Sequence, residues 1–168
     1  MSYNTVYICK KDREHLEEIA RHIIKEKQKE ELHQVDNKKE EERWLTGLMG
    51  EFAVEVLTGL KIIDETAGPS ERYRRPDLEK AGYNVGIKTI KKENCYPLIP
   101  RHNTTAQIIC VRDGNFITVK GIASPSQLNQ HQDDDLVYDW RIRGRKTCFT
   151  GMQYLTDIKY LDMYKKAE

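Results

Sequence analysis

The chain has 168 residues, of which 33% are charged and 38% hydrophobic, and its formal net charge is +1. This length is typical of one domain with its own core, and this charge balance excludes a uniformly basic nucleic-acid coat. No apolar run approaches the roughly 20 residues that span a membrane, and the N-terminal residues lack the layout of a signal peptide. We therefore expect a single cytoplasmic domain over residues 1–168 that does not enter a membrane.

The cysteines are scattered along the chain and form no CxxC pair or Cys/His cluster. This distribution predicts free thiols in a reducing compartment and disfavours a structural zinc site. The residues concerned are Cys9, Cys95, Cys110 and Cys148.

Two helices are predicted in the N-terminal part, after a short strand or an extended lead-in at residues 3–9. The first covers residues 12–35, with Asp12 as its N-cap and apolar residues at helical spacing from Leu16 to Ile24. The second covers residues 40–58 and has a broad apolar face that ends at Gly59, a residue suited to a helix C-terminus. Residues 60–63 are predicted as a short strand.

The remainder of the chain is mainly β. Leu78 and residues 83–90 flank the turn "EKAG" and predict a hairpin, after a turn-rich loop at 64–76. Residues 107–123 predict a second hairpin around Asp113 and Gly114, followed by a short helix or turn at 124–130 and a helical end at about 150–166. This order predicts an α/β or α+β sandwich, in which a mixed central sheet with hairpins is flanked by helices around a core at about 40–125.

One stretch, "RRPDLEKAGYNVGIKT", carries residues suited to phosphodiester cleavage. That reaction needs hard oxygen ligands for a divalent metal and a cation near the scissile phosphate. Asp77 follows Pro76, and Lys88 lies on the strand beyond the turn. Because side chains alternate along a strand, Lys88 shares one face with Gly86 and Asn84.

Glu51 and Glu55 lie one turn apart on the same side of the second predicted helix. They border the apolar residues Leu48 and Phe52, so their carboxylates are partly shielded and need partners. We expect these glutamates to meet the strand-borne aspartate and lysine at one edge of the sheet.

A helix glutamate, then "PD", then a strand ending in "IK", then a hairpin resembles the PD-(D/E)XK nuclease superfamily over about residues 45–122. The resemblance implies a restriction-endonuclease-like core and an endonuclease that hydrolyses DNA with Mg²⁺, for which Mn²⁺ substitutes. It implies that Asp77 is a catalytic metal ligand, Lys88 the catalytic lysine and Glu51 the helix acid that completes the site.

Gly86 departs from this pattern, because the superfamily usually has Asp or Glu there. Glycine in a strand leaves a volume beside Asp77 and often marks close approach by another group. The acid is expected to have moved to a helix, with Glu51 or Glu55 as donor and metal ligand, whereas Glu79 and Glu93 lie in predicted turns. Loss of the acid would instead leave an inactive nuclease-fold subunit that binds DNA or RNA.

Basic clusters predict where a polyanion would bind, since Arg and Lys pair with phosphates. Gln107 opens the strand "QIICV" and could contact the Lys88 face, although a solvent-facing glutamine on an edge strand is the more ordinary interpretation. A homodimer is expected because cutting a duplex favours two sites, and the small, polar chain resembles phage or mobile-element nucleases. A rival hypothesis is an interaction protein that works through a charged helix at 12–58. The predicted nucleic-acid contacts are Arg72, Arg74, Arg75, Lys91, Lys92, Arg141, Arg143, Arg145 and Lys146.

Overall fold

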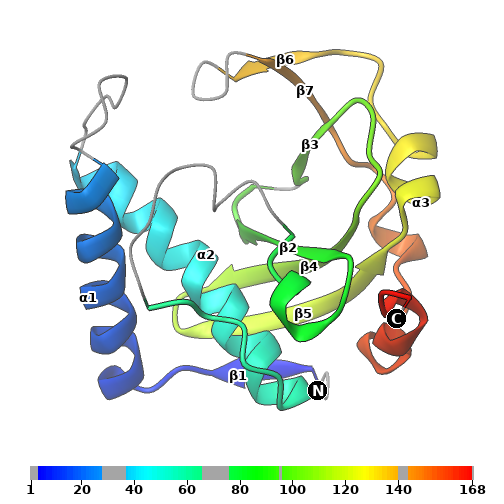
Figure 1. The fold of residues 1–168 in the computed structure, drawn as a ribbon. Coiled ribbons are helices and arrows are strands. Elements are labelled where there is room, and N and C mark those ends of the chain that lie inside the picture. The colour runs from blue at the N-terminus through cyan, green and yellow to red at the C-terminus, as the bar shows by residue number, and fades with distance from the viewer. Residues whose placement is uncertain (1–3, 28–36, 66–75, 95, 140–143, 168) are drawn as a thin grey trace.

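The computed structural model describes residues 4–27, 37–65, 76–94, 96–139 and 144–167. Helices and strands alternate irregularly along this chain, with the long helices first (Figure 1). The elements are β1 (Thr5–Tyr7), α1 (Lys10–Lys27), α2 (Asn37–Thr58), η2 (Glu79–Ala81), β2 (Val85–Lys91), β3 (Leu98–Pro100), β4 (Ala106–Asp113), β5 (Phe116–Ala123), α3 (Pro125–Gln130), β6 (Val137–Asp139), β7 (Gly144–Cys148), η3 (Met152–Tyr154) and η4 (Ile158–Tyr164), where η marks a 3₁₀ helix.

The helix α1 buries the apolar stripe that its sequence predicts, from Leu16 to Ile24, and packs beside α2. It begins at Lys10, so the prediction of Asp12 as its N-cap is wrong. Asp12 lies in the first turn, where its carboxylate accepts a hydrogen bond from Sγ of Cys9 at 3.3 Å and complements the helix dipole. Residues 28–35 of the predicted helix lie outside the described residues.

The main sheet has the strand order β1-β5-β4-β2 and is mixed. β2 runs parallel to β4, whereas the β4–β5 and β1–β5 pairs are antiparallel. The β4–β5 hairpin turns at Asp113 and Gly114, where Gly114 has a φ of 61° that favours glycine. The predicted mixed sheet flanked by helices is confirmed.

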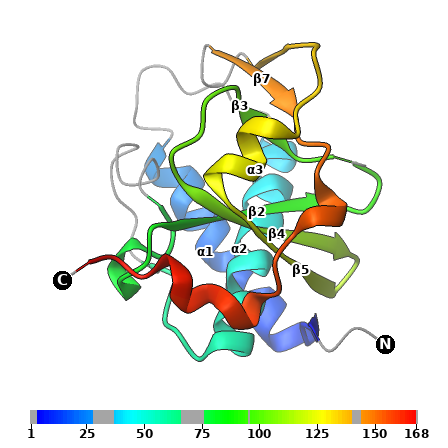
Figure 2. The same cartoon turned by 90° about the vertical axis from the view of Figure 1, so that its right-hand side faces the viewer.

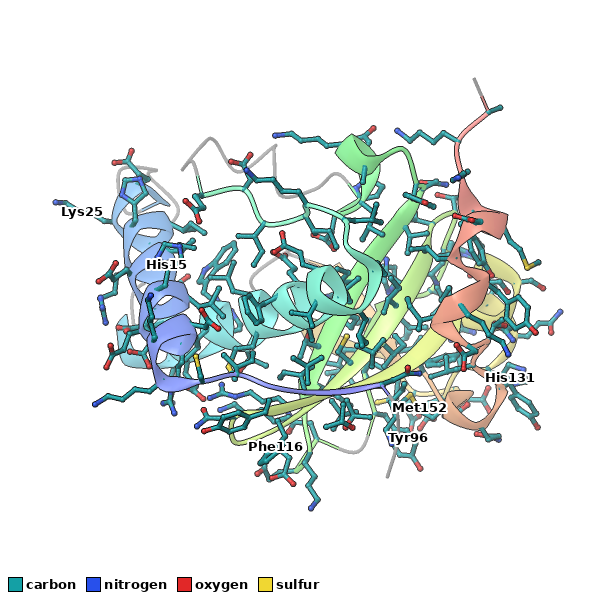
Figure 3. All side chains as sticks on the ribbon, turned by 90° about the horizontal axis from the view of Figure 1, so that it is seen from below. His15, Lys25, Tyr96, Phe116, His131 and Met152 are labelled. Carbon is teal, nitrogen blue, oxygen red and sulfur yellow. The ribbon has the colours of Figure 1, made fainter. Side chains whose placement is uncertain are left out.

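Helices cover this sheet on both sides. α2 contacts β2, β4 and β5, and α3 contacts β4 and β5. Figures 1 and 2 show α1 and α2 on one side, and α3 with the C-terminal segments on the other. Seen from below, His15 and Lys25 on α1 lie at the opposite end of the molecule from His131 and Met152 (Figure 3).

A second sheet, of strand order β3-β7-β6, lies beside the main one and is antiparallel. It shares a small core with α3, formed by Ile99, Ala123, Leu128 and Phe149. Residues of this sheet line one side of a groove that faces α2.

Three local predictions need correction. Residues 60–63 form no strand, because their amides bind a side chain of α2 instead of a neighbouring strand. The segment before "EKAG" is a turn that bonds to β2 without becoming a strand. The C-terminal end is built of short 3₁₀ turns and not of an α-helix. Within the described ranges, no helix has the length and apolar character needed to cross a membrane.

Candidate active site

The candidate site lies along β2, which is one of the two edge strands of the main sheet. The Pro76–Asp77 turn is held against this free edge. The backbone N–H of Leu78 donates to the carbonyl of Val85 at 3.0 Å, and the N–H of Ile87 donates to Oδ2 of Asp77 at 2.6 Å. The aspartate thereby satisfies a strand amide that has no neighbouring strand to bond to, and its position on β2 is fixed.

Asp77 and Glu51 are both half-buried, and their carboxylates lie within electrostatic range of each other. Burial raises the pKa of Asp77 to about 6, although the Ile87 N–H and the positive charge of Lys88 oppose the shift. Burial, with the nearby charges of Asp77 and Glu55, raises the pKa of Glu51 well above its usual range. Asp77 thus lies within electrostatic range of both Glu51 and Lys88. The catalytic roles of these three residues stay predictions.

Close packing of α2 on β2 carries Glu51 to this edge. A Cβ on Gly50 would overlap Oγ1 of Thr89, so only glycine allows this approach. The charge of Glu51 also helps raise the pKa of the Cys110 thiol, to which burial contributes most. Glu51 therefore lies over the sheet between β4 and the Asp77 turn.

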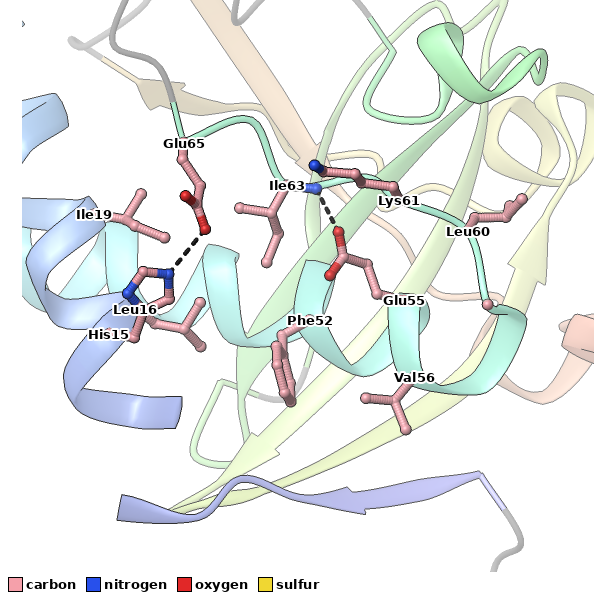
Figure 4. Close-up of a pocket in the computed structure, with 11 residues that line it drawn as sticks. His15, Leu16, Ile19, Phe52, Glu55, Val56, Leu60, Lys61, Ile63 and Glu65 are labelled. Carbon is pink, nitrogen blue, oxygen red and sulfur yellow. Dashed lines mark hydrogen bonds and ion pairs between the residues drawn. The ribbon is translucent and has the colours of Figure 1, made fainter. Parts of the chain in front are cut away.

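Glu55 is placed one turn further along α2 and is engaged in the fold. Its Oε1 accepts the backbone N–H groups of Ile62 and Ile63 at 2.6 and 2.7 Å, which holds the segment after α2 (Figure 4). Glu55 lines a cavity of about 460 Å³ between α1 and α2 that also holds His15. Its role as a metal ligand stays a prediction.

The volume that Gly86 leaves beside the strand is filled by Gln107. The two residues are partners in the parallel β2–β4 pair, and a Cβ on Gly86 would lie only 2.6 Å from Oε1 of Gln107. The interpretation of Gln107 as a solvent-facing residue on an edge strand is wrong, because β4 lies between β2 and β5 and the side chain is half-buried. The predicted close approach at Gly86 is confirmed.

A groove of about 810 Å³ begins at Lys88 and runs between α2 and the small sheet. Its floor includes Ile90 and Leu98, and its wall includes Tyr96, half of whose surface is exposed. Cations outnumber carboxylates along it. The charged residues that line it are Lys39, Arg43, Lys88, Lys91 and Lys146, against the single carboxylate of Glu42.

Two of these cations, Lys39 and Arg43, were not predicted as nucleic-acid contacts. They lie one turn apart on α2 in "NKKEEERW", and this spacing was the available signal. The charges and hydrogen bonds of Lys91 and Arg112 lower the pKa of Glu42 even though burial raises it, so the groove's one acid is matched by cations.

The other predicted contacts divide into two groups. Lys92 pairs with Asp113 at 3.2 Å on the exposed end of the β4–β5 hairpin, and Arg145 is exposed, and neither lines the groove. Glu79 pairs with Lys166 at 3.0 Å and is engaged at the surface. The predicted contacts Arg72, Arg74, Arg75, Arg141 and Arg143 lie outside the described residues.

The described residues gather no group of three or more His, Cys, Asp or Glu side chains placed to hold a metal. Mg²⁺, however, keeps several waters and is commonly held by one or two carboxylates. The Asp77–Glu51 pair meets that lower requirement. Both pKa values are raised, which means that ionising the two acids is unfavourable here, and a bound cation would offset that cost. The donor set therefore fits Mg²⁺ with few protein ligands.

In comparisons with known proteins, the chain matches no family model, no curated protein and no solved structure.

Proposed function

We propose that the protein is a divalent-metal-dependent endonuclease that hydrolyses phosphodiester bonds in DNA. The observation that supports this most is the half-buried Asp77–Glu51 pair beside Lys88, which itself lines a groove rich in cations. Acids whose pKa values are raised by burial and by a neighbouring charge cluster at functional sites, since placing like charges together destabilises a fold.

Each residue has a distinct task in this proposal. Asp77 and Glu51 would hold Mg²⁺ or Mn²⁺, which supplies Lewis-acid polarisation of the phosphate and a more acidic water. Lys88 donates hydrogen bonds from its ammonium group to the nucleophile or to a phosphate oxygen as negative charge develops there. The hydrogen bond from Ile87 fixes the Asp77 carboxylate, so that the pair needs little rearrangement.

The groove positions the substrate for this chemistry. Its lysines and arginine attract the phosphate backbone, and Lys88 belongs both to the groove and to the electrostatic surroundings of Asp77. A strand lying in the groove would thus bring a phosphate to the carboxylate pair. Phosphate contacts do not separate DNA from RNA, so the assay below includes both.

A catalytically inactive nucleic-acid-binding subunit of the same fold is the second candidate. The glycine at position 86 and the absence of a three-acid group among the described residues favour it. Titration calorimetry with Mn²⁺ separates the two, because an inactive subunit has no reason to bind the metal through Asp77.

Two wider features belong to the same proposal. Cleavage of both strands of a duplex favours a homodimer with two sites. A cytoplasmic location would give the enzyme access to DNA and keep its cysteines reduced.

The decisive experiment is cleavage of supercoiled plasmid, a branched DNA and a matched RNA with Mg²⁺ or Mn²⁺. Asp77→Asn keeps the hydrogen bond from Ile87 and removes the charge, so cleavage should fall by at least about a hundredfold without loss of fold. Asp113→Asn, at an exposed site on the far hairpin, serves as the control and should cleave normally. Equal cleavage by wild type and Asp77→Asn would contradict the proposal.

A further inference from the structure

The side chain of Gln107 reaches from β4 over Gly86 on the neighbouring strand β2. In the parallel register Gly86 pairs with Gln107 and Lys88 with Ile109. A Cβ built on Gly86 would lie 2.6 Å from Oε1, 2.8 Å from Nε2 and 3.0 Å from Cδ of Gln107. Real Cβ atoms do not approach other atoms this closely, so any side chain at position 86 would displace the Gln107 carboxamide.

The carboxamide therefore stands where the side chain of residue 86 would begin. Residues 86 and 88 point to the same face of β2, because side chains alternate along a strand. Lys88 on that face acts on the charge of Asp77, and Asp77 itself bonds to the amide of Ile87 between them. The polar end of Gln107 is thus held on the strand face that carries Lys88, one residue from the Asp77 contact.

An amide oxygen suits this position better than a carboxylate would. Glu51 and Asp77 already bring two carboxylates to this edge of the sheet, and a third carboxylate there would add another like charge. A carboxamide supplies a hard oxygen ligand of the kind that Mg²⁺ and Mn²⁺ accept without adding charge. Its NH₂ group can donate a hydrogen bond at the same time.

We propose that Gln107, reaching over Gly86 from β4, supplies through Oε1 the third protein oxygen of the metal site, in place of an acid on β2. This inference rests on the proposed metal-dependent function and specifies how its site is completed. It also accounts for the pairing of a glycine on one strand with a long polar side chain on the next.

The test measures Mn²⁺ binding to the metal-free protein by titration calorimetry in the absence of nucleic acid. Gln107→Leu keeps a similar volume over Gly86 but has no oxygen, and should weaken Mn²⁺ binding about tenfold or more. Gln107→Glu adds a carboxylate at the same place and should bind Mn²⁺ more tightly than Gln107→Leu. Gln130→Leu, at an exposed position on α3, is the matched control and should leave the affinity unchanged.

A second pair of variants moves the ligand back to β2. In Gly86→Asp alone, the Cβ of the new residue meets the Gln107 carboxamide, so the two side chains compete for the same space. Gly86→Asp combined with Gln107→Ala opens the space and should bind Mn²⁺ more tightly than Gln107→Ala alone. Failure of the double variant to improve on Gln107→Ala would contradict the proposal.

The outcomes separate this inference from the proposed function. Mn²⁺ binding that is lost in Asp77→Asn but unchanged in Gln107→Leu would overturn the role of Gln107 and leave the carboxylate site standing. Loss in both variants supports both. Wild-type protein that binds no Mn²⁺ at millimolar concentration would overturn both together.

Discussion

The raised pKa of Asp77 means that its ionised form, which can bind a cation, destabilises the metal-free fold. Its pKa lies at about 6 in the folded chain, above the ordinary value of 3.8. An acid whose pKa is raised by folding binds protons more tightly in the native state, so stability falls as pH rises between the two values. Above that window the whole penalty is present, and the fold carries it at neutral pH.

We therefore predict that Asp77→Asn stabilises the metal-free protein while it abolishes cleavage. With chelator at pH 7.5, the free energy of unfolding should rise by about 1–3 kcal/mol. Near pH 4 wild type and variant should be almost equally stable, since the aspartate is then protonated in the folded state. Urea denaturation at both pH values measures this, and a variant that is less stable than wild type at pH 7.5 would contradict the buried-charge interpretation.

Glu55 is predicted to act mainly on stability. Glu55→Ala leaves the N–H groups of Ile62 and Ile63 without their acceptor and should cost about 1–3 kcal/mol. Glu55→Gln keeps an acceptor oxygen and should lose much less. Thermal denaturation gives the stabilities, and Mn²⁺ titration of Glu55→Gln gives the second readout: weaker metal binding in this folded variant would show that Glu55 is also a ligand.

At the scale of elements, the closeness of α2 to β2 decides whether Glu51 reaches the site. Gly50→Ala should lower stability by about 1–3 kcal/mol, because its Cβ would overlap Thr89 and push the helix away. Gly47→Ala, on the same helix with nothing within 4 Å of its Cβ, should raise stability by about 0.5–1 kcal/mol. Chemical denaturation of both variants measures the contrast.

A double variant tests whether Gly50 and Thr89 limit how closely α2 approaches β2. Thr89→Ala removes the hydroxyl that a Cβ on Gly50 would meet, so the double variant should recover part of the loss caused by Gly50→Ala. Additive effects in the double variant would mean that the two residues do not limit the approach of α2 to β2.

Elements with a long periodic pattern were predictable from the sequence. The apolar spacing of α1 and the Asp113–Gly114 turn of the β4–β5 hairpin each have a local physical cause. Ile62 and Ile63 are β-branched and favour a strand, yet Glu55 accepts hydrogen bonds from both of their amides. A tertiary contact of this kind leaves no periodic pattern in the sequence. The prediction of a C-terminal α-helix was wrong, because this segment forms short 3₁₀ turns. The turn η4 buries Ile158 and Leu161, and two buried residues set no α-helical apolar period.

The candidate site was predictable as far as its residues lie in short motifs. Asp77, Lys88 and Glu51 come together because a turn, a strand and a helix face each fix one of them. The position of Gln107 beside Gly86 depends on the register between β2 and β4. Lys39 and Arg43 belong to the candidate site because they line the groove between α2 and the small sheet. Register and groove are tertiary properties that no local pattern encodes.

At the scale of the whole molecule, charge is balanced overall and uneven locally. A net charge of +1 gives little general attraction for nucleic acid, so affinity must come from the groove. Since each phosphate contact releases condensed counterions, binding through the groove should weaken steeply as salt increases. This expectation separates the nuclease and the inactive subunit from a protein that works through its charged helices.

We predict that Lys146→Ala reduces DNA affinity and lowers the slope of log affinity against log salt by about 0.9 for one lost contact with duplex. Lys120→Ala, exposed on β5 and outside the groove lining, changes the net charge equally and should leave both quantities unchanged. Fluorescence anisotropy with an Asp77→Asn background and chelator measures binding without cleavage. Equal slopes for the two variants would show that overall charge governs binding. That result would contradict the proposal that DNA reaches Lys88 through the groove.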